Sequence, residues 1–129
     1  ELGKKNQTPE TPNVFSIYLL KNVINDMLKK GIVNIINETN YKSKIIDFTI
    51  KNHPQISHLI KNEAIRSKTV KVANTNKKSN YLIDKLINQN LIIGKGYGSN
   101  DYQIRIANFP THSKENIEML CDIISRTEF

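Results

Sequence analysis

The sequence has few of the residues that build disulfide-stapled, metal-bound or membrane-embedded proteins. Its 129 residues include one cysteine and no tryptophan, and aromatic residues make up only 7%. The single Cys121 excludes an internal disulfide and a multi-cysteine zinc site. No apolar run approaches the roughly 20 residues that a membrane-spanning helix needs. The length and composition fit one domain with one hydrophobic core.

Arginine is also scarce, although the chain is basic. There are 19 basic and 12 acidic residues, which give a formal charge of +7, but only three of the basic residues are arginine. No basic run is longer than two residues, so the paired lysines at 4–5, 29–30 and 77–78 are expected on the surface. The charge alone supports one alternative function, a stand-alone basic module that binds nucleic acid. Such binding would weaken steeply with added salt.

The chain is predicted to begin with an extended lead-in followed by a helix. Residues 1–10 are polar and show no hydrophobic period, and the folded domain is predicted to cover residues 11–129. Thr11 and Pro12 predict a helix start, with Thr11 as the N-cap and Pro12 in the first helical position. Gly31 predicts the end of this helix.

The remaining elements are predicted in the order helix, strand, helix, strand, strand, helix. They cover 32–52, 55–75, 76–90, 91–93, 103–107 and a last helix that follows Ser113. Within 55–75 the alternating segment 68–73 is the clearest strand, and Ile56, Leu59 and Ile60 predict a short strand before it. The complete order is thus α-α-β-α-β-β-α. This pattern predicts an α+β fold, in which helices pack on a small, mostly antiparallel sheet.

A glycine-rich stretch, Gly-Lys-Gly-Tyr-Gly at residues 94–98, superficially resembles a phosphate-binding loop. A dinucleotide-binding fingerprint needs Gly-x-Gly-x-x-Gly leading into a helix. Here the third glycine comes one position early and a strand is predicted to follow. The stretch is therefore interpreted as a turn between two strands that uses the freedom of glycine at positive φ.

Arg105 is the candidate binding residue that stands out from the pattern. It lies between Ile104 and Ile106 in a predicted strand, so its side chain points to the opposite face from these two. On a half-buried face the guanidinium would need an anion, and a carboxylate suits its two-pronged geometry. On a polar face it would simply be solvated, and the pattern leaves both alternatives open. Arg66, which precedes another predicted strand, is a weaker candidate of the same kind.

The other titratable residues predict no catalytic or metal site. The three histidines lie at positions 53, 58 and 112 and have no metal-ligand spacing. Cys121 falls on an apolar helix stripe and is expected in the core. The remaining carboxylates considered are expected on helix surfaces: Asp26, Glu38, Asp47, Asp84 and Asp122.

Three segments together resemble the phosphoserine aminotransferases. Glu-Thr-Pro-Asn-Val-Phe-Ser-Ile-Tyr at 10–18 is similar to their Asn-Thr-Pro-Pro-x-Phe-x-Ile-Tyr stretch, and Ile-Arg-Ser-Lys-Thr-Val at 65–70 is similar to their Arg-Ser-x-Thr-Val strand entry. Gly-Tyr-Gly at 96–98, Gln-Ile-Arg-Ile-Ala-Asn-Phe-Pro at 103–110 and the helix after Ser113 resemble the end of that family's small domain. The likeness runs from about residue 6 to residue 127.

The resemblance implies roles for two residues. Thr11 matches a threonine that reaches across the family's dimer to the phosphate of pyridoxal phosphate in the partner subunit. Arg105 matches a strand arginine that holds the α-carboxylate of the substrate. Two departures stand beside these matches, since Glu10 replaces a common asparagine and 96–98 replaces a His-Arg segment.

The resemblance further implies that this chain is the C-terminal small domain of a class V, fold-type-I enzyme. The parent would be a cytoplasmic homodimer that uses pyridoxal phosphate to transfer an amino group between glutamate and 3-phosphohydroxypyruvate in serine biosynthesis, with no metal, nucleic-acid or membrane partner. The lysine that binds the cofactor would precede Glu1, so the chain alone is expected to be inactive. A different class V enzyme of this cofactor type is the other alternative.

Overall fold

The computed structural model describes residues 2–128 and separates into two compact units, Glu1–Ile35 and Ile36–Phe129. The first unit contains a short 3-10 turn, Leu2–Lys5, and the helix α1, Val14–Lys30. It also contains the first residues of α2, Ile32–Asn52. The two predicted helices over 11–30 and 32–52 are thus confirmed, apart from the start of the first.

The start of α1 corrects the prediction that Thr11 is its N-cap. The N-cap is Asn13, whose side-chain oxygen accepts a hydrogen bond from the backbone N–H of Ser16 at 3.0 Å. Asparagine caps helices somewhat better than threonine does, and the helical backbone begins only at Val14, directly after Asn13. The predicted end is confirmed, because Gly31 has a φ of +83° and its N–H bonds to the carbonyl of Met27.

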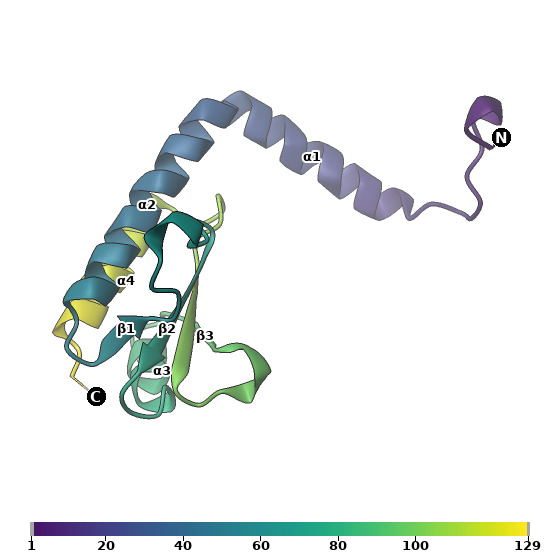
Figure 1. Cartoon of the computed structure of the whole chain (residues 1–129). Coiled ribbons are helices and arrows are strands. Elements are labelled where there is room, and N and C mark those ends of the chain that lie inside the picture. Colours follow the sequence, from purple (N-terminus) through teal and green to yellow (C-terminus); the bar gives the residue numbers. More distant parts are fainter. Residues whose placement is uncertain (1, 129) are drawn as a thin grey trace. The chain divides into compact units, whose positions relative to one another are not determined.

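The second unit holds a four-stranded antiparallel sheet with the order β1-β2-β4-β3 (Figure 1). The strands are β1, Ile56–His58; β2, Val70–Thr75; β3, Gly94–Lys95; and β4, Gln103–Ala107. Besides α2, the helices are α3, Asn80–Ile87, and α4, Lys114–Arg126. The predicted α+β class is confirmed by these helices and this small antiparallel sheet.

The stretch 55–75 supplies two strands, as its pattern predicted, and a 3-10 turn, Glu63–Ile65, lies between β1 and β2. Two predicted boundaries differ in the structure. The apolar run 91–93 precedes β3 rather than forming it. The predicted helix over 76–90 is shortened to α3 because hydrogen bonds from Thr75 Oγ1 to the carbonyl of Lys77, and from the N–H of Ser79 to the carbonyl of Asp101, hold the preceding residues in a turn.

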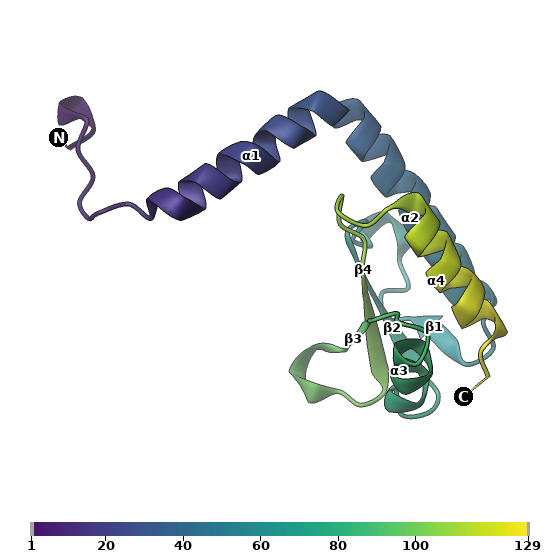
Figure 2. The same cartoon turned by 180° about the vertical axis from the view of Figure 1, so that it is seen from behind.

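The two faces of the sheet have different environments. Burial alternates along β2 and β4, so that Ala73, Ile104 and Ile106 are buried while Val72 and Arg105 are only half-buried. The helices cover the first of these faces (Figure 2). The core on that side joins residues from every helix of the second unit: Ile46, Ile50, Ile56, Ala73, Leu82, Leu86, Ile93, Ile104, Ile106, Ile117, Leu120, Cys121 and Ile124. We call the other side the open face.

Polar contacts fix α2 against α4 and the loop that precedes it. The hydroxyl of Tyr41 donates to Glu118 at 2.5 Å, and the ring of His53 lies 3.1 Å from the carbonyl of Thr127. Lys42 is fully buried, and its ammonium donates to the carbonyls of Phe109 and His112. The contacts of Lys42 and His53 satisfy buried polar groups that would otherwise destabilise the fold.

Two substitutions on α4 test this description of the core. Ile124→Ala removes a side chain that is 1% exposed and should lower the free energy of unfolding by about 2–5 kcal/mol. Met119→Ala is the matched control, because Met119 is 47% exposed on the same helix and should change stability by less than about 1 kcal/mol. Urea denaturation measures both, and equal losses would contradict the assigned helix face.

Candidate functional site

The two residues predicted to bind ligands lie in different units of the structure. Thr11 is an exposed residue of the first unit, two positions before the N-cap of α1. No hydrogen bond within the described residues uses its hydroxyl group. Arg105 lies in the second unit, in the middle of β4. Each is therefore described within its own unit.

Arg105 projects from the open face of the sheet. In the strand register it stands opposite Val72 of β2 on one side and Gly94 of β3 on the other. The half-buried face that the sequence pattern allowed for this residue is thus present. Within the part of the chain that the structure describes, no carboxylate lies within ion-pairing distance of Arg105.

The contact that holds Arg105 is aromatic. Its guanidinium carbon lies 4.7 Å from the centre of the Tyr97 ring, which is the geometry of a cation–π interaction. Tyr97 begins a 3-10 turn, Tyr97–Ser99, in the loop between β3 and β4. Gly98 in this turn has a φ of +66°, which confirms the predicted turn for the later part of the glycine-rich stretch, whereas Gly94 and Lys95 form β3.

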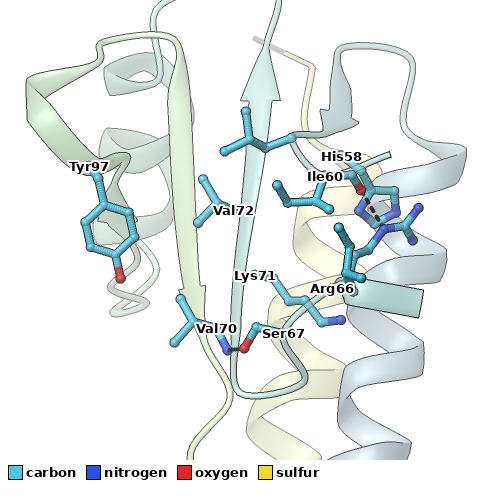
Figure 3. Close-up of a pocket in the computed structure, with 10 residues that line it drawn as sticks. His58, Ile60, Arg66, Ser67, Val70, Lys71, Val72 and Tyr97 are labelled. Carbon is cyan, nitrogen blue, oxygen red and sulfur yellow. Dashed lines mark hydrogen bonds between the residues drawn. The ribbon is translucent and has the colours of Figure 1, made fainter. Parts of the chain in front are cut away.

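A hollow of about 460 Å³ lies on the open face beside β2 (Figure 3). Its lining is mainly apolar, with a few polar side chains at the rim. The lining residues are His58, Leu59, Ile60, Ile65, Arg66, Ser67, Val70, Lys71, Val72 and Tyr97. Clefts with this mixture of apolar walls and a few polar groups are typical ligand sites.

Arg66, the weaker candidate, is engaged by the backbone of its own loop. Its Nε donates to the carbonyl of Ile60 at 2.7 Å, and its Nη2 donates to the carbonyl of Lys61 at 2.8 Å. Nearby, the hydroxyl oxygen of Ser67 accepts the backbone N–H of Val70 (Figure 3). These bonds shape the loop between β1 and β2, so the geometry gives Arg66 a structural role.

Sequence reasoning missed a polar cluster behind this hollow. Lys71 is 5% exposed on the core side of β2, and its ammonium forms an ion pair with Asp47 of α2 at 2.7 Å. Figure 3 shows the Lys71 side chain extending away from Val70 and Val72 toward the helices. Asp47 was predicted on a helix surface without this contact. Only the strand alternation, which places Lys71 on the same face as Ala73, carried a signal for it.

His58 completes this cluster. Its Nδ1 lies 3.7 Å from Oδ1 of Asp47, and its Nε2 lies 3.3 Å from the carbonyl of the same residue. Burial lowers the pKa of His58 from its ordinary value of 6.5. The charges of Arg66 and Lys71 act in the same direction, whereas Asp47 raises the pKa.

Neither Cys121 nor any group of metal-ligating side chains among the described residues forms a reactive site. Cys121 is buried as predicted, and burial raises the pKa of its thiol, which opposes formation of a reactive thiolate. Among the described residues no three histidine, cysteine or carboxylate side chains gather as a metal site would require. None of the described helices is long and apolar enough to cross a membrane.

Solved protein structures resemble this chain. A crystal structure of a phosphoserine aminotransferase from Cytophaga hutchinsonii matches 99% of this chain, with a TM-score of 0.91 and 36% sequence identity. The chain is similar to part of a phosphoserine aminotransferase. The predicted family resemblance is thereby confirmed. The chain spans 36% of the length of that solved chain.

A second, more distant structure shares the fold alone. It is a complex of a cystine C-S lyase with cysteine persulfide, and it matches 72% of this chain and 24% of its own at a TM-score of 0.57. The sequence identity is only 12%. No protein-family model matches the chain, and no curated protein sequence does.

The lowered pKa of His58 predicts a specific pH dependence of stability. The unfolded chain binds a proton to this residue near pH 6.5, before the folded chain does, so the free energy of unfolding should fall as pH drops through 6.5. The loss should level off below the pKa in the folded state. His58→Gln should show a smaller loss between pH 7.5 and 5.5 in urea denaturation. Because His53 and His112 remain in both proteins, two identical pH profiles would contradict the assignment.

Proposed function

We propose that this chain is the C-terminal portion of a phosphoserine aminotransferase. The parent enzyme would transfer an amino group between glutamate and 3-phosphohydroxypyruvate, as a step of serine biosynthesis in the cytoplasm. The likeness to the Cytophaga enzyme over 99% of the chain supports this proposal more than any other observation. The resemblance of the segments around Thr11, Arg66 and Arg105 to the same family agrees with this likeness.

In this proposal Arg105 binds the α-carboxylate of the substrate. Arginine donates two parallel hydrogen bonds to a carboxylate, which fixes both the position and the orientation of the bound acid. The half-buried open face strengthens such a bond, because water competes for the guanidinium less well there than at a fully exposed position. The absence of a carboxylate partner from the described residues leaves the guanidinium donors available to a ligand.

Thr11 is proposed to donate its hydroxyl to the phosphate of pyridoxal phosphate in a partner subunit. The residue suits this contact, because it is exposed and its hydroxyl takes no part in the hydrogen bonds of the described residues. When bound, the cofactor supplies the electron sink that amino-group transfer requires. The chain would contribute the phosphate contact and the carboxylate contact, and the rest of the enzyme would supply the cofactor lysine.

The helix α1 supports the existence of a covering partner. All of its apolar side chains are exposed in this chain: Val14, Phe15, Ile17, Tyr18, Leu19, Leu20, Val23, Ile24, Met27 and Leu28. An apolar patch of this extent is typical of a protein interface. We propose that the rest of the enzyme and a second subunit of a homodimer cover it.

The role of Arg105 is tested in the enzyme that carries this chain. Arg105→Ala should lower kcat/KM for glutamate by about 10- to 100-fold, because the charged hydrogen bonds to the carboxylate are lost. Arg126→Ala is the matched control, since Arg126 is an exposed residue of α4 paired with Asp122. Steady-state kinetics measure kcat/KM for both variants. An unchanged kcat/KM in Arg105→Ala would refute the assigned role.

The chain of 129 residues is expected to be inactive by itself. None of its lysines matches the context of the cofactor lysine in the family it resembles, so it should not transfer an amino group when pyridoxal phosphate is added. The assay follows formation of 2-oxoglutarate from glutamate and 3-phosphohydroxypyruvate. Turnover above that of free cofactor would show that this division of the active site is wrong.

A further inference from the structure

The glycine-rich stretch at 94–98 shapes the surroundings of one side chain. Three of its five residues are glycine, and only Gly98 has a positive φ, so the backbone does not demand glycine at positions 94 and 96. A Cβ atom built on Gly94 would lie 3.2 Å from both Nε and Nη2 of Arg105. One built on Gly96 would lie 2.4 Å from Cβ of Gln103. The two glycines therefore leave room for the side chains that β4 presents on the open face.

Tyr97, which follows these glycines, covers the guanidinium from another direction. A cation–π contact uses the flat face of the guanidinium and leaves the N–H groups at its edge free to donate. The contact at 4.7 Å restricts a long side chain that would otherwise sample many rotamers. Less entropy then remains to be lost when a ligand binds.

We propose that Tyr97 and Gly94 together set the direction in which Arg105 offers its guanidinium edge to the carboxylate of an amino or oxo acid. Tyr97 is a positioning residue, because it acts through Arg105 and not by contact with the ligand. The inference rests on the proposed function, in that it takes Arg105 to be the carboxylate-binding residue. It gives the glycine-rich stretch at 94–98, which superficially resembles a phosphate-binding loop, a role in positioning Arg105.

The polar pair next to Arg105, Gln103 and Asn74, supports a defined direction for the Arg105 guanidinium. Gln103 lies two residues before Arg105 on the same face of β4, and its amide donates to Asn74 of β2 at 3.1 Å. Gln103 is thus engaged with its cross-strand neighbour. Arg105 has no such polar partner among the described residues, and its guanidinium lies over the Tyr97 ring instead.

The first test measures the geometry in the 129-residue chain. The three arginines should give three Nε–Hε signals in a ¹H–¹⁵N NMR spectrum, and the Tyr97 ring should shift that of Arg105 upfield. Tyr97→Phe should keep this shift, whereas Tyr97→Leu and Gly94→Ala should reduce it. Tyr97 is 63% exposed, so Tyr97→Leu should leave the thermal midpoint nearly unchanged. A signal that is the same in wild type and Tyr97→Leu would overturn the proposal.

The second test is a double-mutant cycle in the enzyme that carries the chain. Tyr97→Leu should raise KM for glutamate by about 3- to 10-fold with little change in kcat. Tyr97→Phe keeps the aromatic ring and should therefore keep the wild-type KM. In the Arg105→Ala background, Tyr97→Leu should have no further effect, because Tyr97 acts only through Arg105.

The outcomes separate the two proposals. If Arg105→Ala lowers kcat/KM but Tyr97→Leu acts equally with and without Arg105, the positioning role is wrong and the carboxylate role of Arg105 stands. If Arg105→Ala has no effect, the carboxylate role fails and the positioning role fails with it. Non-additivity together with rescue by phenylalanine supports the proposal.

Discussion

The ion pair between Lys71 and Asp47 is the constraint on which the arrangement of the second unit depends. It ties β2 to α2 on the face of the sheet that carries the hydrophobic core, and Lys71 is nearly inaccessible there. Breaking a buried pair by removal of one partner leaves an uncompensated charge, which is strongly destabilising. The pair therefore favours the register in which Lys71 faces the helices. The same register places Val70 and Val72 on the open face.

The open face carries Arg105, the residue of the second unit that is proposed to bind the substrate carboxylate. Because side chains alternate along a strand, the orientation of β4 that buries Ile104 and Ile106 against the helices also places Arg105 on the opposite face. The adjacent strand β3 is only two residues long and begins with glycine, which leaves room for the guanidinium. The position of Arg105 on the open face is thus a consequence of core packing on the other face of the sheet.

Sequence reasoning predicted most of the helices and the fold class because these depend on local signals. The hydrophobic period of α4, the glycine at the end of α1 and the proline after α2 all act within a few residues. The boundaries of α3 and β3 were less accurate, since long-range hydrogen bonds such as that from the N–H of Ser79 to the carbonyl of Asp101 determine where they lie. For the same reason the Lys71–Asp47 pair, which joins residues 24 positions apart, was not predicted.

The exposed apolar side chains of α1 support the proposal that the chain works within a larger assembly. A helix with an apolar stripe on one side can be stable on the surface of a small domain, whereas one that is apolar on most sides needs cover on most sides. Helices of this length are only marginally stable in water without tertiary contacts. The described residues bury none of the apolar side chains of α1, although the lysines at its end and the Asn13 cap favour its formation. Local signals thus favour the helix, and contacts beyond those of the described residues would have to stabilise it.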